Sequence, residues 1–177
     1  MNKYRKNIYS QNGEDGIIEE VMQRLHIAKG LACEFGAHDG YWLSNTRNLI
    51  DKGWDYLHLE ASNGQTVTPE NVNELVPQKL QLLSIDIDGN DYEVWKAYTG
   101  KADCVVIEIN SGLNPFVEQF HETTGASFVT MLRLGKAKGY FLLWHTGNMI
   151  FLLKKYKKYF PEAQVKDIDK FDSSFML

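Results

Sequence analysis

The chain has 177 residues, of which 44% are hydrophobic and 24% are charged, an ordinary balance for one globular domain. Its net charge of −4 excludes a general nucleic-acid-binding surface. Two cysteines, Cys33 and Cys104, are too few for a secreted disulfide framework. The sequence shows no apolar signal core and no window long enough to cross a membrane. We therefore expect a single cytoplasmic domain over residues 1–177, with neither nucleic acid nor membrane as partner.

The first elements form a helix–strand–helix succession. Apolar residues at helical spacing predict a helix over 14–25, with acidic residues in its first turn. A short apolar run predicts a strand over 31–35. A second helix is expected over 45–52, with Ser44 as its N-cap and Gly53 just past its end.

The middle of the chain continues the same alternation. A strand over 55–59 ends in Glu60, and a threonine followed by proline predicts a short helix over 69–76. An apolar run that ends in an acidic residue predicts a buried strand over 82–86. A helix over 91–98 follows it.

The last elements differ from the rest. We expect a buried strand over 104–108, a short helical segment from Pro115, and a longer helix over 127–138. Apolar runs at 140–144 and 148–153 are separated by three residues, too few for a parallel crossover, so they predict an antiparallel hairpin. The expected fold class is α/β, with a mostly parallel sheet and a C-terminal antiparallel hairpin.

A basic run follows the hairpin. Lysines at 154, 155, 157 and 158 surround Tyr156. Such a run can touch phosphate or an acidic partner, but a solvated face after a terminal strand is the interpretation we favour.

The most informative segment lies between the first strand and the second helix. Glu34 ends the strand, Gly36 and Gly40 follow, and Ser44 opens the helical segment. Glycines let the backbone pass close to a ligand, and the turn offers unpaired N–H groups. An acidic residue at the strand end suits a ligand with hydroxyl or ammonium groups better than a bare phosphate. A purely structural turn is the alternative.

Several motifs in order resemble the FkbM-type methyltransferases, which depend on S-adenosylmethionine (SAM), and their bacterial and phage relatives. The resemblance extends from about residue 9 to 153 and rests on the segments 9–17, 34–40 with 43–46, 53–60, 83–92, 106–110 and 138–140. It implies the Rossmann-like class I methyltransferase fold, SAM as cofactor, and methylation of a hydroxyl on a sugar or small metabolite, with a small-molecule or glycan acceptor as partner.

The chain departs from that family between its second and third predicted strands. Only 21 residues separate Glu60 from Leu82, too few for the usual helix, strand and helix, so the fold is reduced there. The missing piece would wall the adenine pocket. Either a second subunit or another loop completes that wall, or the site has decayed. The reduction also predicts that strand 55–59 lies at or near the sheet edge, where a homodimer forms or the 61–81 loop folds back over it.

Four of the predicted strand ends carry an acidic residue: Glu34, Glu60, Asp86 and Glu108. Parallel strands bring their carboxyl ends to one edge of the sheet, which is where ligands bind in open α/β folds. The resemblance implies that Glu60 accepts hydrogen bonds from the ribose hydroxyls. It also implies that Glu34 organises the turn and, through water or backbone, the methionyl ammonium. The full predicted cofactor set is Gln11, Glu34, Gly36, Ala37, His38, Asp39, Gly40, Ser44, Glu60 and Asp86.

The predicted catalytic residues follow the third and fourth strands: Asp86, Asp88, Glu108 and Asn110. Methyl transfer to oxygen needs positioning and removal of a proton, for which Asp86 is a candidate base. The oxygen atoms of Asp88, Glu108 and Asn110 also suit a divalent metal ion. We regard such an ion as possible but do not predict one. Turn and helix-capping roles are the structural alternative for Asp88.

Two further interpretations remain open. Residues 11–15 could fold over the cofactor as a lid, or simply begin an amphipathic helix. The four tryptophans are expected to be core residues more often than ligand contacts. For the whole chain, the alternatives to a methyltransferase are a trimmed protein that binds or consumes SAM without an acceptor, and a degenerate Rossmann-like interaction module.

Overall fold

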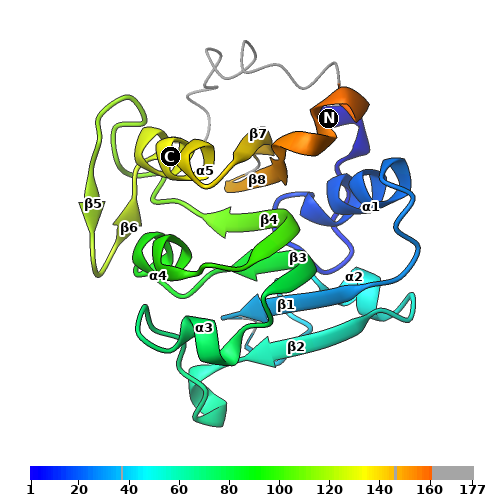
Figure 1. The fold of residues 1–177 in the computed structure, drawn as a ribbon, viewed down its shortest axis with the longest axis horizontal. Helices are drawn as coiled ribbons and strands as arrows, with labels where there is room; N and C mark the ends of the chain where they lie inside the picture. The colour runs from blue at the N-terminus through cyan, green and yellow to red at the C-terminus, as the bar shows by residue number, and fades with distance from the viewer. Residues whose placement is uncertain (37, 146, 161–177) are drawn as a thin grey trace.

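A computed structural model describes residues 1–36, 38–145 and 147–160, which form an α/β structure around one six-stranded mixed sheet (Figure 1). The strand order is β2-β1-β3-β4-β8-β7. The bounds are β1 Leu31–Phe35, β2 Asp55–Leu59, β3 Lys79–Ile85, β4 Lys101–Glu108, β7 Tyr140–His145 and β8 Asn148–Leu153.

The sheet is parallel over four strands and antiparallel over the last two. β2, β1, β3 and β4 run in one direction, whereas β8 runs against both β4 and β7. The predicted antiparallel hairpin is therefore confirmed. Its second strand, β8, is inserted beside β4, with Ile107 opposite Met149.

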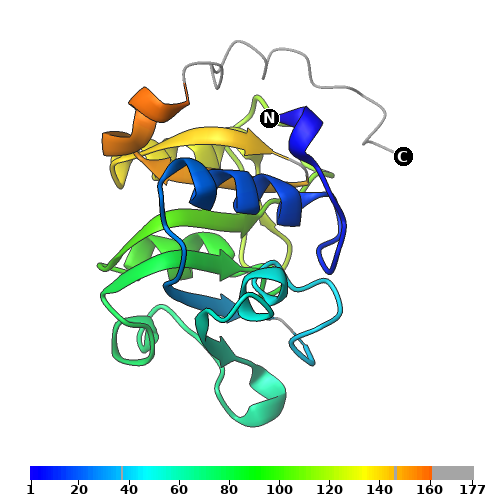
Figure 2. The same ribbon diagram turned by 90° about the vertical axis from the view of Figure 1, so that its right-hand side faces the viewer.

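Helices cover both faces of the sheet (Figure 2). One face carries α1 (Glu14–Arg24) and α2 (Arg47–Ile50), which pack through a cluster that includes Ile17 and Leu49. The other carries α3 (Val72–Leu75), α4 (Asp91–Ala97) and α5 (Phe128–Ala137), whose cluster is centred on Trp95. Short 3-10 helices η1 (Asn2–Tyr4), η2 (Ala61–Asn63) and η3 (Lys154–Tyr159), and a two-stranded hairpin of β5 (Phe120–His121) and β6 (Gly125–Ala126), complete the described elements. Both cysteines are buried and free.

The predicted helix from Pro115 is wrong. Residues 111–119 form turns that lead into β5. The side chain of Asn110 accepts a hydrogen bond from the Gly112 N–H, and that of Asn114 accepts one from the Phe116 N–H. Such side-chain bonds to the backbone offer the chain an alternative to helical hydrogen bonding.

Two other predicted helices are shorter than expected. Instead of 69–76, α3 begins at Val72, because the Asn71 carboxamide accepts from the Thr68 N–H and holds a turn before the helix. Instead of 45–52, α2 covers four residues from Arg47. The hydroxyl of Ser44 still accepts from the Arg47 N–H, but the residue that precedes the helix is Thr46.

Strands β3 and β4 begin three residues earlier than predicted. Lys79 lies opposite Lys101 in the parallel pair, and polar residues alternate through both beginnings. β2 has a sheet partner on one side only among the described strands, so the prediction that it lies at the sheet edge is confirmed.

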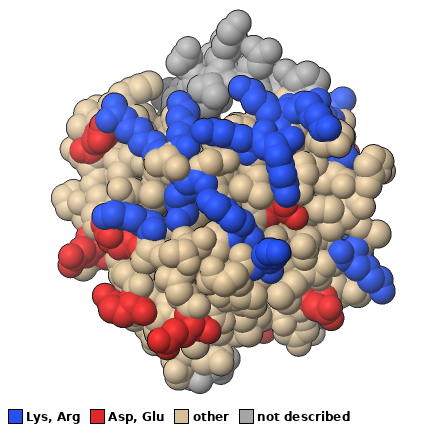
Figure 3. All heavy atoms as spheres, viewed as in Figure 1, with Lys and Arg blue, Asp and Glu red and all other residues tan. Residues whose placement is uncertain are grey.

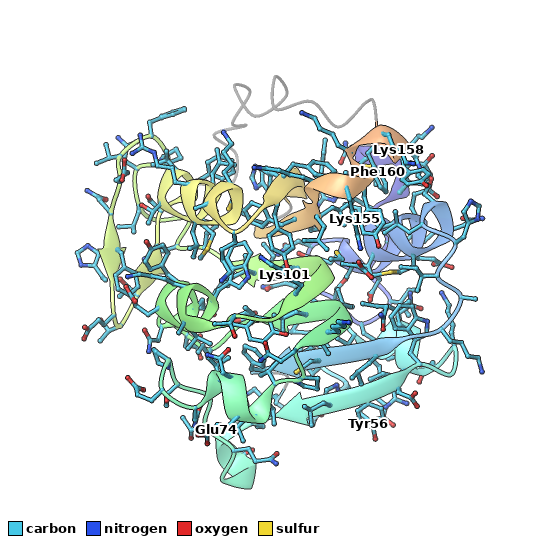
Figure 4. The ribbon with its side chains drawn as sticks, in the orientation of Figure 1. Tyr56, Glu74, Lys101, Lys155, Lys158 and Phe160 are labelled. Carbon is cyan, nitrogen blue, oxygen red and sulfur yellow. The ribbon has the colours of Figure 1, made fainter. Side chains whose placement is uncertain are left out.

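Lysine and arginine side chains gather over the upper half of the face shown in Figure 3. Figure 4 labels Lys101, Lys155 and Lys158 among them. Lys101 Nζ donates to the Lys138 carbonyl at the end of α5, and Lys138 Nζ donates to the Tyr98 carbonyl at the end of α4. Lysines that bind the free carbonyls of helix C-termini are favourably placed in the helix dipole, which accounts for part of this basic face. Among the described residues, no helix has the length and apolarity needed to cross a membrane.

Candidate functional site

A pocket of about 490 Å³ opens at the carboxyl ends of β1, β2 and β3. Its lining comes from three segments: the turn after β1, the residues from the end of β2 to Thr68, and the loop after β3. A second pocket of about 350 Å³ lies at the end of β4 and shares Asp88 with the first. The predicted edge of the sheet therefore does carry a cavity.

The turn after β1 depends on Gly36. This residue has a φ of +80°, and a Cβ there would lie 1.5 Å from the carbonyl oxygen of Asp86. Only glycine lets the ends of β1 and β3 approach so closely. The Asp86 N–H in turn donates to the Phe35 carbonyl, which joins the two strand ends below the pocket.

Glu34 is buried at the end of β1 and binds the segment that precedes α2. Its carboxylate accepts hydrogen bonds from the hydroxyls of Ser44 and Thr46 and from the Asn45 N–H, at 2.6–2.7 Å. These bonds hold residues 44–46 against the end of β1. Burial lowers the pKa of the neighbouring His58, whose ring lies 3.7 Å from the same carboxylate.

Glu60 follows β2 and lines the same pocket as Gly36. Its carboxylate accepts from the His38 N–H at 3.0 Å and from the Ala61 N–H at 2.9 Å. Each carboxylate oxygen can accept more than one hydrogen bond, so Glu60 retains capacity for ligand hydroxyls. It joins the end of β2 to the turn after β1.

Three carboxylates meet where the two pockets join. Asp86, Asp88 and Glu108 each offer an oxygen, and these oxygens lie within 4.8 Å of one another. Burial raises the pKa of both Asp86 and Glu108, and for Asp86 the charge of Glu108 raises it further. The pair therefore retains a proton at a pH where ordinary carboxyl groups have lost theirs.

The loop after β3 is shaped by Asp91, the first residue of α4. Its buried carboxylate accepts from the N–H groups of Ile87 and Gly89. Between them Asp88 has a φ of +56°, an unusual conformation for a residue other than glycine. The loop thus presents the Asp88 side chain between the two pockets.

The chemistry of the lining is acidic. The two linings together include five carboxylates: Glu34, Glu60, Asp86, Asp88 and Glu108. Neither pocket has a lysine or arginine among its described lining residues. Such a site suits cations and hydroxyl groups, and it disfavours phosphates. Asp86, Asp88 and Glu108 could also hold a divalent cation, although acidic groups often cluster without one.

Most of the predicted site residues line one of the two pockets. The first pocket is lined by Glu34, Gly36, His38, Glu60, Asp86 and Asp88, and the second by Asp88, Glu108 and Asn110. Predicted residues outside both linings are Gln11, Asp39, Gly40 and Ser44. Ala37 lies outside the described residues.

The geometry of residues 11–15 favours the beginning of a helix over a lid. Asp15, in the first turn of α1, accepts hydrogen bonds from the N–H groups of Ile8, Tyr9 and Ser10. Gln11 is exposed and uses its carbonyl to accept from the Asn7 side chain. These bonds fold the N-terminal segment back onto its own helix.

Sequence reasoning missed two parts of the lining. Residues 65–68 form one wall of the first pocket, so the shortened 61–81 segment itself supplies a wall there. Trp42 and Leu43, from the loop after β1, also belong to the lining. Trp42 is exposed, which contradicts its expected place in the core, whereas Trp54 and Trp95 are buried as expected. Neither wall carries a sequence motif that marks it.

No model of a known protein family matches this chain, and a search of curated proteins gave no match. The resemblance to the FkbM-type family therefore stays a prediction based on motifs.

Proposed function

We propose that this protein is a SAM-dependent methyltransferase that transfers a methyl group to a hydroxyl of a sugar or small metabolite. The observation that carries the proposal is the pocket between Gly36 and Glu60, at the carboxyl ends of parallel strands, with only acidic charged side chains in its described lining apart from His38.

The sheet supports the same proposal. A dehydrogenase-type doubly wound sheet is parallel throughout, whereas here an antiparallel hairpin places β8 between β4 and β7. That ending is characteristic of class I methyltransferases, so we interpret the fold as a Rossmann-like methyltransferase fold that is reduced between β2 and β3.

The lining fits the chemistry of SAM. SAM carries a sulfonium and an ammonium group, and acidic side chains favour both cations. Glu60 would accept the ribose hydroxyls while it still holds the His38 N–H. The wall formed by 65–68 would enclose the base. A dinucleotide or a nucleoside triphosphate fits poorly, because the described lining has no lysine or arginine to neutralise its phosphates.

When bound, SAM supplies a methyl group that is activated for transfer to a nucleophile. The chain has to position the acceptor hydroxyl and remove its proton. Asp86 is the candidate base, because it lines the cofactor pocket and lies beside Glu108 at the second pocket. Its raised pKa makes it a stronger base than an ordinary carboxylate once it is deprotonated.

Calorimetric titration with SAM and with S-adenosylhomocysteine tests the cofactor. We expect saturable binding of both, and the absence of binding would leave the interaction-module alternative. Mass spectrometry of SAM incubated with the protein alone tests whether SAM is consumed when no acceptor is present. Stable SAM supports a methyltransferase that waits for its acceptor, and breakdown of SAM would support a SAM-consuming protein.

The pH dependence of methyl transfer tests the base. A carboxyl with a raised pKa is deprotonated only as the pH rises, so we expect activity to increase through a midpoint well above the usual carboxyl range near pH 4. Glu108→Gln removes a neighbouring charge that helps raise the pKa of Asp86, so the midpoint should move to lower pH. An unchanged midpoint in a variant that still binds SAM would assign the base elsewhere.

A further inference from the structure

The loop between β1 and α2 exposes a tryptophan at the edge of the pocket. Trp42 lines the 490 Å³ cavity yet is 72% exposed, and its neighbours Tyr41 and Leu43 are exposed as well. An indole ring has a large apolar surface, and leaving it in water is unfavourable unless a partner covers it.

This exposure does not result from a loose loop. The Asp39 carboxylate accepts hydrogen bonds from the N–H groups of Tyr41 and Trp42, both at 2.9 Å. The guanidinium of Arg47 lies 3.9 Å from the centre of the Tyr41 ring and forms an ion pair with Asp51. The backbone at Trp42 is therefore held in place from within the loop and from α2.

The end of the loop is held under strain. Leu43 has a φ of +61°, a left-handed conformation that costs a residue with a side chain about 1–2 kcal/mol. The next residue, Ser44, is tied to the buried carboxylate of Glu34 at 2.6 Å. Strained conformations persist where the surroundings enforce them, and they are frequent at binding sites. The loop is thus preorganised to present Trp42 beside the pocket.

We propose that Trp42 is a specificity-determining residue that stacks on the ring of the acceptor and holds it over the first pocket. This inference rests on the proposed function. In the proposed function, the turn at Gly36 and the carboxylate of Glu60 line the pocket and bind the cofactor. Most of the Trp42 surface faces solvent, which is the side from which an acceptor would enter after the cofactor has bound. A sugar ring presents apolar C–H groups to an indole and hydroxyls to Asp86 and Asp88, both in the same lining.

Two measurements on the same variants test the inference. The first is calorimetric affinity for S-adenosylhomocysteine. The second is binding to an immobilised panel of uncharged mono- and oligosaccharides with S-adenosylhomocysteine present. The variants are Trp42→Ala and Trp42→Phe, with Phe116→Ala as matched control, because Phe116 is 70% exposed but lines neither pocket.

We expect Trp42→Ala to lose at least tenfold in sugar binding, a much larger loss than any in its affinity for S-adenosylhomocysteine. Trp42→Phe should be intermediate, and Phe116→Ala should match the wild type. A loss of S-adenosylhomocysteine affinity as large as the loss of sugar binding in Trp42→Ala would overturn the inference by making Trp42 a cofactor contact. Unchanged sugar binding in that variant, or no sugar binding by a wild type that binds S-adenosylhomocysteine, would also overturn it. A wild type that binds no S-adenosylhomocysteine would instead remove the proposed function.

Discussion

Individual carboxylates in this protein have unlike roles although they end neighbouring strands. Glu34 is engaged with the segment before α2, Glu60 links two loops, and Asp86 has a pKa raised by burial and by the charge of Glu108. Their positions in the sequence are equivalent, one acidic residue at each strand end. The hydrogen-bond donors that surround each one decide whether it builds the site or remains available to a ligand.

Asp86 should reduce the stability of the folded protein at alkaline pH. Its pKa is raised in the folded state, so its contribution is fully present below the unfolded pKa and is lost as the pH rises through the folded pKa. Asp86→Asn removes that loss. We expect the variant to be more stable than the wild type at pH 9, by about 1–2 kcal/mol, and equally stable near pH 4. Denaturant unfolding at both pH values measures the difference, and an equal effect at both would contradict it.

Gly36→Ala should destabilise the protein by about 2–4 kcal/mol, because the new Cβ meets the Asp86 carbonyl. Gly64→Ala is a matched control. Gly64 also has a positive φ, +74°, but nothing lies within 4 Å of a Cβ there, so the cost should be only about 1–2 kcal/mol. Urea unfolding compares the two variants. Equal losses of unfolding free energy in the two variants would contradict this prediction. They would show that the positive φ alone, and not the close approach of β1 and β3, requires glycine at position 36.

At the scale of elements, the loops at the carboxyl ends of β1 and β2 act as one unit. Glu60 and its bond to the His38 N–H connect them, and residues 65–68 complete the pocket wall. A change at the end of β2 therefore affects the turn after β1. The short connection between β2 and β3 still provides a wall, although it contains no strand among its described residues.

Glu60→Ala should weaken SAM binding by about 1–3 kcal/mol, the scale of hydrogen bonds lost to a charged acceptor. Glu60→Gln keeps one oxygen acceptor and should lose less. Glu74→Ala is the control, because Glu74 is exposed on α3 and lies outside both pocket linings (Figure 4). Calorimetric titration measures all three. Wild-type affinity in a folded Glu60→Ala variant would place the ribose elsewhere.

At the scale of the whole molecule, the sheet has one exposed parallel edge. Among the strands that the structure describes, β2 pairs only with β1, and Tyr56 on β2 is exposed at that edge (Figure 4). Unpaired strand edges promote association unless they are charged or covered. The homodimer predicted from the shortened 61–81 segment stays a prediction.

We expect a two-fold dimer through β2, with twice the monomer mass of 20.3 kDa at micromolar concentration. Tyr56→Lys places a charge on the edge and should shift the equilibrium to monomer, whereas Phe116→Lys, a control at another exposed position, should not. Sedimentation velocity measures both. A wild-type protein that remains a clean monomer would contradict the prediction.

Apolar patterning in the sequence identified the six strands of the main sheet, their mostly parallel arrangement and the final hairpin, but not the short strands β5 and β6. Apolar runs identify buried strands, and three residues between 144 and 148 allow only an antiparallel return. The glycine turn and the acidic strand ends were also readable, because they combine a backbone requirement with position at one sheet edge. The helix predicted from Pro115 was wrong, because hydrogen bonds accepted by the side chains of Asn110 and Asn114 compete with helix formation.

Contacts between distant segments, which no local pattern encodes, set which predicted residues share a pocket and which side chains are exposed. Gln11 and Gly40 lie near cofactor residues in the sequence pattern but outside the pocket lining, whereas Gln65 and Trp42 belong to it without a motif. Pocket walls and raised pKa values arise from contacts between segments that are distant along the chain. Burial of Asp86 beside Glu108 depends on the pairing of β3 with β4, and no local pattern encodes that distance.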